Sequence, residues 1–74
     1  MSDKLYVVEW LGKDGQSYRE EFSGEDGYFD AETYYVAVEQ DGKAYSATFT
    51  ELTRKFSGAS RRVLLSFNIA TQGR

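Results

Sequence analysis

Neither cysteine nor histidine occurs among the 74 residues of this chain. Disulfide bonds are therefore excluded, and the usual nitrogen and sulfur ligands of zinc and copper are absent. A chain of this length has a thin core, because it buries only about 60% of the surface that the unfolded chain exposes. We therefore expect a single domain over residues 1–74 that holds no metal or cofactor and is stabilised by its one Trp, six Tyr and five Phe side chains.

The same two absences restrict catalysis. Histidine is the commonest general base and cysteine the most nucleophilic side chain. Carboxylates are plentiful, but a domain this small rarely encloses a cleft between two of them. The glycines of residues 12–17 lack the spacing of a phosphate-binding loop, and residues 26–37 lack the ligands of an EF-hand. We therefore expect a protein that is not an enzyme and acts by binding.

No targeting or membrane segment is apparent in the sequence. Residues 1–4 lead directly into a strand-like run, without the basic and apolar regions of a secretory signal. No apolar run approaches the roughly 20 residues that a membrane span needs. The expectation is a cytoplasmic protein without membrane contact.

Residues 5–11 and 16–22 predict a β-hairpin. The first run is rich in β-branched and aromatic residues, and the second places Tyr18 and Phe22 on one face. Asp14-Gly15 lies between them, and Asp-Gly is a strong hairpin signal because glycine accepts a positive φ.

A second hairpin is predicted from residues 33–39 and 43–48, with Asp41-Gly42 as its turn. Tyr34 to Val38 favour a strand, because β-branched and aromatic side chains lose χ1 freedom in a helix. Alternatively, residues 30–32 begin a helix that ends at Gly42, and a β-grasp arrangement would then fit the chain.

A short helix is predicted near residues 49–57. Thr48 and Glu51 match a capping box, in which each side chain satisfies a backbone N–H of the other. Phe49, Leu52 and Phe56 follow at the i, i+3, i+7 spacing of one helix face. Gly58 can end such a helix in the left-handed conformation.

The last predicted strand is marked by strict alternation. Its apolar residues are Val63, Leu65, Phe67 and Ile69, and they predict one buried face. Residues 71–74 are expected to fray. The predicted class is therefore α+β and mostly β. It is an antiparallel sheet or small open barrel of about five strands in the order β-β-β-β-α-β.

Charge is divided unevenly along the chain. Residues 1–42 hold eleven acidic and three basic residues, a net charge of −8, whereas residues 43–74 hold one acidic and six basic residues, a net charge of +5. Such asymmetry suggests an interaction surface. Alternatively, an antiparallel fold interleaves the two halves and their charges cancel.

Exposed aromatic residues among carboxylates predict a protein-binding surface. Tyr34 and Tyr35 would point to opposite faces of a strand, so only one can enter the core. Tyr28 and Phe29 lie in an acidic segment flanked by glycines, and the alternative for Phe29 is that it closes an open end of the sheet. The candidate binding residues are Glu25, Asp26, Tyr28, Phe29, Asp30, Glu32 and Tyr35. Small acidic domains, such as those of bacterial viruses and other mobile elements, often act as inhibitors or adaptors, which suggests a basic target protein.

Two other partners remain open. Single-stranded nucleic acid would bind through basic residues of the second half, although the net charge of −3 opposes it. These residues are Lys43, Arg54, Lys55, Arg61 and Arg62. A second copy of the chain could pair with the last strand, which has few charges after its first residues.

Overall fold

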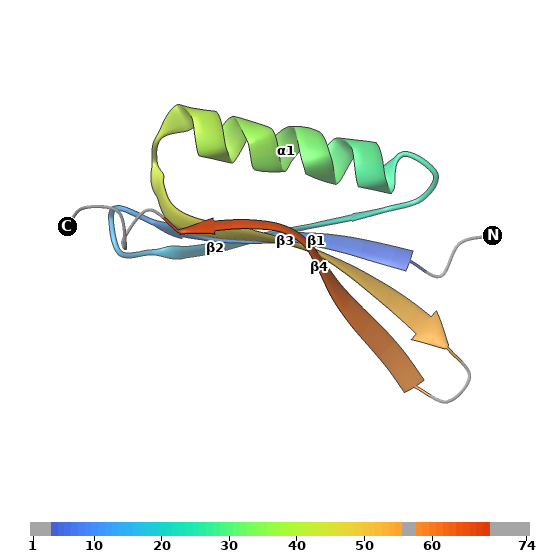
Figure 1. Ribbon diagram of the computed structural model, residues 1–74. Helices are drawn as coiled ribbons and strands as arrows, with labels where there is room; N and C mark the ends of the chain where they lie inside the picture. The colour runs from blue at the N-terminus through green and yellow to red at the C-terminus, as the bar shows by residue number, and fades with distance from the viewer. Residues whose placement is uncertain (1–3, 56–57, 69–74) are drawn as a thin grey trace.

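The computed structural model describes residues 4–55 and 58–68, in which the order of elements is β1, β2, α1, β3, β4 (Figure 1). The strands form one open antiparallel sheet in the spatial order β2-β1-β3-β4, and α1 lies across one face of it. The mostly β class and the antiparallel sheet are thus confirmed. The count of five strands and the order β-β-β-β-α-β are wrong. The tail expected to fray, residues 71–74, lies outside the described residues.

The first predicted hairpin is confirmed. It consists of β1 (Lys4–Gly12) and β2 (Ser17–Ser23), in which Trp10 lies directly opposite Tyr18. Gly15 in the turn has a φ of 87°, a conformation that a residue with a Cβ rarely adopts. The Asp-Gly signal therefore acts here as the sequence indicated.

Residues Gly27–Asp41 form α1, a helix of 15 residues. Ala31, Tyr35 and Val38, at the spacing i, i+4, i+7, are buried on its inner face. Gly42 ends the helix with a φ of 71°, and its N–H donates to a carbonyl of the last turn. The inner face is apolar although the segment as a whole is acidic.

This helix replaces the second predicted hairpin. The strand prediction for residues 33–39 is wrong, and the alternative of a helix ending at Gly42 is the observed structure. Aromatic and β-branched residues cost a helix only tenths of a kcal/mol each, about 0.7 kcal/mol at most. Burying Tyr35 and Val38 against the sheet contributes more, about 1.5–3 kcal/mol for a full side chain. Glycine at position 42 suits a hairpin turn and a helix end equally well, so it did not distinguish them.

The helix predicted over residues 49–57 is also wrong. Residues 49–55 continue β3 (Ala44–Lys55), and residues 56–57 lie outside the described part. Phe49 lies opposite Val8 of β1 and is completely buried. Ala47 and Phe49 alternate with threonines, so the segment also fits the period of a strand, and β1 supplies the pairing partner that the capping-box interpretation ignored.

The last predicted strand is confirmed within β4 (Gly58–Asn68), which begins earlier than predicted. Its pairing with β3 shifts by one residue, because Phe49 pairs with Leu65 and the next residue of β3 pairs with Val63. Leu64 is therefore an extra, bulged residue.

The bulge changes which side chains of β4 face the core. Leu64 and Phe67 pack against the core, whereas Val63 is 53% exposed and Leu65 42% exposed. The predicted buried face is therefore correct for Phe67 and wrong for Val63 and largely for Leu65. Ile69, the fourth predicted member, lies outside the described residues.

The core lies between α1 and the central strands. Val8 of β1 and Phe49 of β3 are its largest completely buried side chains. The helix packs against β1, β2 and β3, and a ring contact between Tyr35 and Phe67 reaches β4. The outer strand β4 is consequently the least covered part of this face.

Candidate protein-binding surface

Residues 25–41, which comprise α1 and the two residues before Gly27, hold six carboxylates and no basic residue. In the described part of the chain, none of these carboxylates lies in an ion pair. They are Glu25, Asp26, Asp30, Glu32, Glu39 and Asp41. The charge asymmetry of the sequence is therefore preserved in space over the helix, and the alternative that interleaving cancels it does not hold there.

Phe29 projects from the first turns of this acidic helix. Its side chain is 67% exposed, the largest value among the large apolar side chains that the structure describes. Asp26 precedes it by three residues and Glu32 follows it by three, so both lie beside it on the helix surface. Phe29 does not close an end of the sheet. It stands among uncompensated carboxylates.

Tyr28 is divided between the core and the surface. Its ring centroid lies 5.6 Å from that of Tyr6 and 5.5 Å from that of Phe49, yet 45% of the residue remains exposed. These contacts fix the ring, so its exposed part has little freedom to lose on binding. We refer to Glu25, Asp26, Tyr28, Phe29, Asp30 and Glu32 together as the acidic helix surface.

Tyr35 does not belong to this surface. It is buried on the inner face of α1, where its ring contacts those of Phe49 and Phe67. Burial raises the pKa of its phenol, and Glu39 adds a smaller contribution in the same direction. The prediction that Tyr35 contacts a partner is therefore corrected: a helix, unlike the expected strand, turns this residue inward.

The basic residues proposed for nucleic acid do not converge on one site. Arg61 lies opposite Leu52 and Arg62 opposite Glu51, so the two arginines point to different faces of the sheet. Arg54 is near them on β3, whereas Lys43 precedes the other end of that strand, about 35 Å away at 3.3 Å per residue. Lys55 ends β3, and its side chain lies outside the described part.

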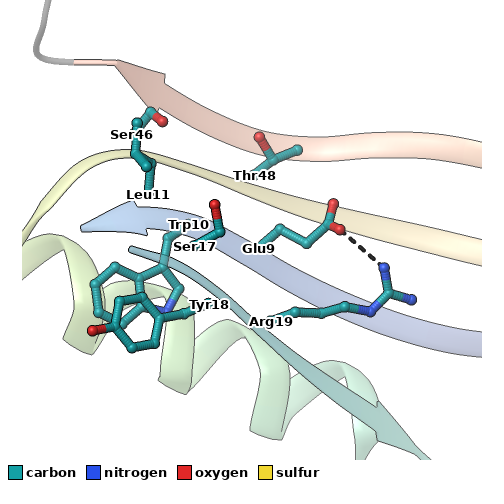
Figure 2. Close-up of a pocket in the computed structure, with 8 residues that line it drawn as sticks. All are labelled: Glu9, Trp10, Leu11, Ser17, Tyr18, Arg19, Ser46 and Thr48. Atoms are coloured by element: carbon teal, nitrogen blue, oxygen red, sulfur yellow. Dashed lines mark hydrogen bonds and ion pairs between the residues drawn. The ribbon is translucent and has the colours of Figure 1, made fainter. Parts of the chain in front are cut away.

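Charges on the sheet face away from α1 do compensate each other. Arg19 donates from one terminal nitrogen to Glu9 at 2.9 Å and from the other to Glu21 at 2.8 Å. Figure 2 shows the first of these pairs beside a depression of about 440 Å³. One guanidinium therefore holds both carboxylates.

A second depression, of about 250 Å³, was not anticipated from the sequence. It lies where the first hairpin turn meets the start of β3, and the backbone N–H of Lys13 donates to the carbonyl of Lys43 there at 2.8 Å. Its lining residues are Trp10, Gly12, Lys13, Asp14, Tyr18 and Lys43. The sequence does indicate the pairing of Trp10 with Tyr18 across the Asp-Gly turn. It does not indicate that this turn contacts the segment at Lys43, which follows α1.

Asp14 organises that turn. Its carboxylate accepts hydrogen bonds from the backbone N–H of Gln16 at 2.9 Å and from the hydroxyl of Tyr18 at 2.8 Å. The Gln16 N–H and then the Tyr18 hydroxyl lower the pKa of the Asp14 carboxyl. The same carboxylate raises the pKa of the Tyr18 phenol.

Over residues 4–55 and 58–68, no three histidine, cysteine or carboxylate side chains gather closely enough to hold a metal ion. Across the same residues, α1 is too short and too polar to span a membrane. Comparison of the chain with protein-family models, curated proteins and solved structures found no match.

Proposed function

We propose that this protein is a non-catalytic protein-binding domain, an inhibitor or adaptor that presents the acidic helix surface to a basic target protein. The observation that carries the proposal is the exposure of Phe29 among carboxylates that have no counter-ion within residues 4–55 and 58–68. Protein interfaces commonly combine an aromatic anchor with a polar rim. An exposed phenylalanine contributes little to folding, whereas a partner that covers its ring gains the free energy of burying it.

The helix suits this role because its conformation is fixed before binding. Tyr28 is held by aromatic contacts from β1 and β3, and Tyr35 fixes the inner face of α1 in the core. Full burial of a phenylalanine side chain contributes about 1.5–3 kcal/mol. Little of that gain is lost to ordering, since the surface is already preorganised.

The charges support a basic target, such as the nucleic-acid-binding surface of another protein. Carboxylates spaced along a helix would meet the lysines and arginines that otherwise contact phosphates. Association with such a target would be steered electrostatically and would weaken as salt concentration rises.

Affinity capture from a lysate of the source cell tests the proposal, with and without nuclease treatment. The wild type is compared with Phe29→Ala and with Asp30→Lys. Glu20→Lys is the matched control, because Glu20 is an exposed carboxylate on β2 outside the acidic helix surface. The captured protein is then titrated against each variant at several salt concentrations.

We expect a protein to be captured whether or not nuclease is present, and nucleic acid to compete for it. Phe29→Ala should weaken binding about tenfold or more, as loss of an interface anchor does. Asp30→Lys should slow association and flatten the salt dependence, whereas Glu20→Lys should do neither to the same degree. A target whose affinity ignores salt and both helix variants would contradict the proposal.

The alternative, a module for single-stranded nucleic acid, draws its support from Arg54, Arg61 and Arg62 at the far end of the β3–β4 hairpin. In the described part of the chain these arginines form no ion pair. However, Arg61 and Arg62 point to different faces of the sheet, which weakens the case for a nucleic-acid site. Capture that disappears after nuclease treatment, together with oligonucleotide binding abolished by Arg61→Gln, would favour this alternative.

A further inference from the structure

The two edges of the described sheet, β2 and β4, differ in how they are protected. Edge strands expose unpaired N–H and C=O groups, and proteins guard them with charge, shortness or bulges. β2 has seven residues with the charged run 19–21 at its centre, whereas β4 has eleven residues with the apolar run 63–65 at its centre. The charges of β2 lie in the middle of the strand, whereas those of β4, Arg61 and Arg62, precede its apolar run.

β4 is also the strand that α1 covers least. The helix packs on β1, β2 and β3, and it reaches β4 through the ring contact of Tyr35 with Phe67. Leu65 lies opposite Phe49 on the face of α1 and is 42% exposed, whereas Val63 lies opposite Thr50 on the other face and is 53% exposed. Exposed apolar side chains therefore lie on both faces of this edge strand.

We propose that β4 forms the interface of a homodimer, in which the β4 strands of two copies pair antiparallel about a twofold axis and join both sheets into one. The proposal is independent of the acidic helix surface, which lies on α1. A second copy brings the same unguarded edge and the same apolar run, so one surface satisfies both partners.

The positions of the arginines fix the direction of pairing. Arg61 and Arg62 lie toward the N-terminal half of β4, before the apolar run. Parallel pairing would place the arginines of the two copies side by side, where like charges are destabilising. Antiparallel pairing centred near Leu65 places them toward opposite ends and brings the two Leu65 side chains together at the axis.

Pairing of β4 with β2 of another copy is less favourable for two reasons. It would set the apolar run of β4 against the charged residues 19–21 of β2. It would also leave a free edge at each end and continue into a filament, whereas a twofold dimer closes.

One feature of β4 opposes pairing, the bulge at Leu64, since bulges can protect an edge. The ladder with β3 nevertheless continues on both sides of it, from Ala59 to Val63 and from Leu65 to Phe67. The bulge therefore interrupts the edge at one position and leaves these two segments to pair. The core of this domain is thin, so burial of surface in a dimer would add stability, as it does in other small domains.

Sedimentation velocity of the full chain, from low micromolar to several hundred micromolar, tests the dimer. We expect the wild type to dimerise as concentration rises, and Val63→Lys and Leu65→Lys each to weaken the dimer by roughly tenfold. Val36→Lys is the matched control, since Val36 is a similarly exposed apolar residue on α1. It should dimerise like the wild type. Circular dichroism checks that each variant is folded.

Amide hydrogen exchange of the wild type locates the interface without any substitution. Exchange in β4 should slow as concentration rises, while exchange in β2 stays unchanged. A wild type that is monomeric throughout, slowing confined to β2 or α1, or a dimer disrupted by Val36→Lys but by neither β4 variant would overturn the proposal. None of these outcomes bears on the acidic helix surface, whose test uses other residues.

Discussion

The ring of Trp10 stacks on that of Tyr18, with 4.2 Å between the ring centroids and 15° between the planes. The two residues lie opposite each other in the first hairpin, and the indole N–H of Trp10 donates to the Tyr34 hydroxyl at 3.0 Å. One aromatic pair thus joins β1, β2 and α1. The hairpin that the sequence predicts is thus held to a helix that the sequence offered only as an alternative.

Removing the Tyr34 hydroxyl should loosen this connection. Tyr34→Phe leaves the part-buried N–H of Trp10 without its acceptor, so we expect the free energy of unfolding to fall by about 0.5–1.5 kcal/mol. Trp10 is the single tryptophan, so its fluorescence reports unfolding in urea directly. Tyr45→Phe, at an exposed tyrosine, is the control and should change little. Equal losses in both variants would argue against the role of the hydrogen bond.

The turn held by Asp14 should make stability depend on pH in acid. Hydrogen bonds from Gln16 and Tyr18 hold the pKa of the Asp14 carboxyl below its unfolded value of about 3.9. The resulting stabilisation is complete above the unfolded value and is lost as pH falls through the folded-state pKa. Asp14→Asn should therefore destabilise the protein at neutral pH and reduce the further loss below about pH 4. Urea midpoints measured across that range check this, and parallel curves for the two proteins would contradict it.

The parts of the fold that could be predicted are those with local signals. Asp14-Gly15 between two short runs determines the first hairpin, since a turn that needs a positive φ leaves few alternatives. Alternation of apolar residues predicts the strand at 63–68 in the same way. The bulge at Leu64 could not be predicted, because it depends on the register with β3.

The exchange of helix and strand between residues 30–41 and 49–55 has a nonlocal cause. Each segment fits both periods, so local propensity does not decide between them. The observed arrangement pairs Phe49 with Val8 and packs Tyr35 over Phe49, contacts between residues far apart in sequence. Burial of these side chains outweighs a propensity difference of tenths of a kcal/mol per residue.

The candidate site was predictable where exposure follows from composition alone. Carboxylates at 25, 26 and 30 are exposed, as their charge favours, whereas the exposure of Phe29 was one of two alternatives that its acidic surroundings left open. The position of Tyr35 was not predictable, because it depends on whether the segment is a helix. Likewise, the separation of Lys43 from Arg54 could not be predicted, because it depends on β3 running from Ala44 to Lys55 between them as one strand.

Substitution of the two neighbouring aromatic residues should separate binding from folding. Phe29→Ser changes an exposed side chain, so the free energy of unfolding should stay within about 0.5 kcal/mol of the wild type. Tyr28→Ala removes contacts with Tyr6 and Phe49, and we expect a loss of about 1–2 kcal/mol. Thermal and urea denaturation measure both. A large loss in Phe29→Ser would assign that residue to the fold and remove the main support for the binding surface.

Thr50 offers a variant that should be more stable than the natural protein. It lies on the sheet face away from α1, opposite Val7, and its hydroxyl oxygen is buried with no hydrogen-bond partner in the described part of the chain. A buried hydroxyl without a partner costs about 1–3 kcal/mol, and valine has nearly the same shape. Thr50→Val should therefore stabilise the protein by about 1 kcal/mol, which raises Tm by about 4–8 °C in a domain of this size.

Thr48→Val is the control for this gain. Thr48 lies two residues earlier on the same face of β3, opposite Glu9, but is partly exposed. The two substitutions change strand propensity and chemical composition identically, so any difference between them reports the burial of the hydroxyl at position 50. If Thr50→Val is instead less stable than the wild type, the hydroxyl is satisfied in solution by a bound water, whose loss then costs more than the burial of a methyl group returns.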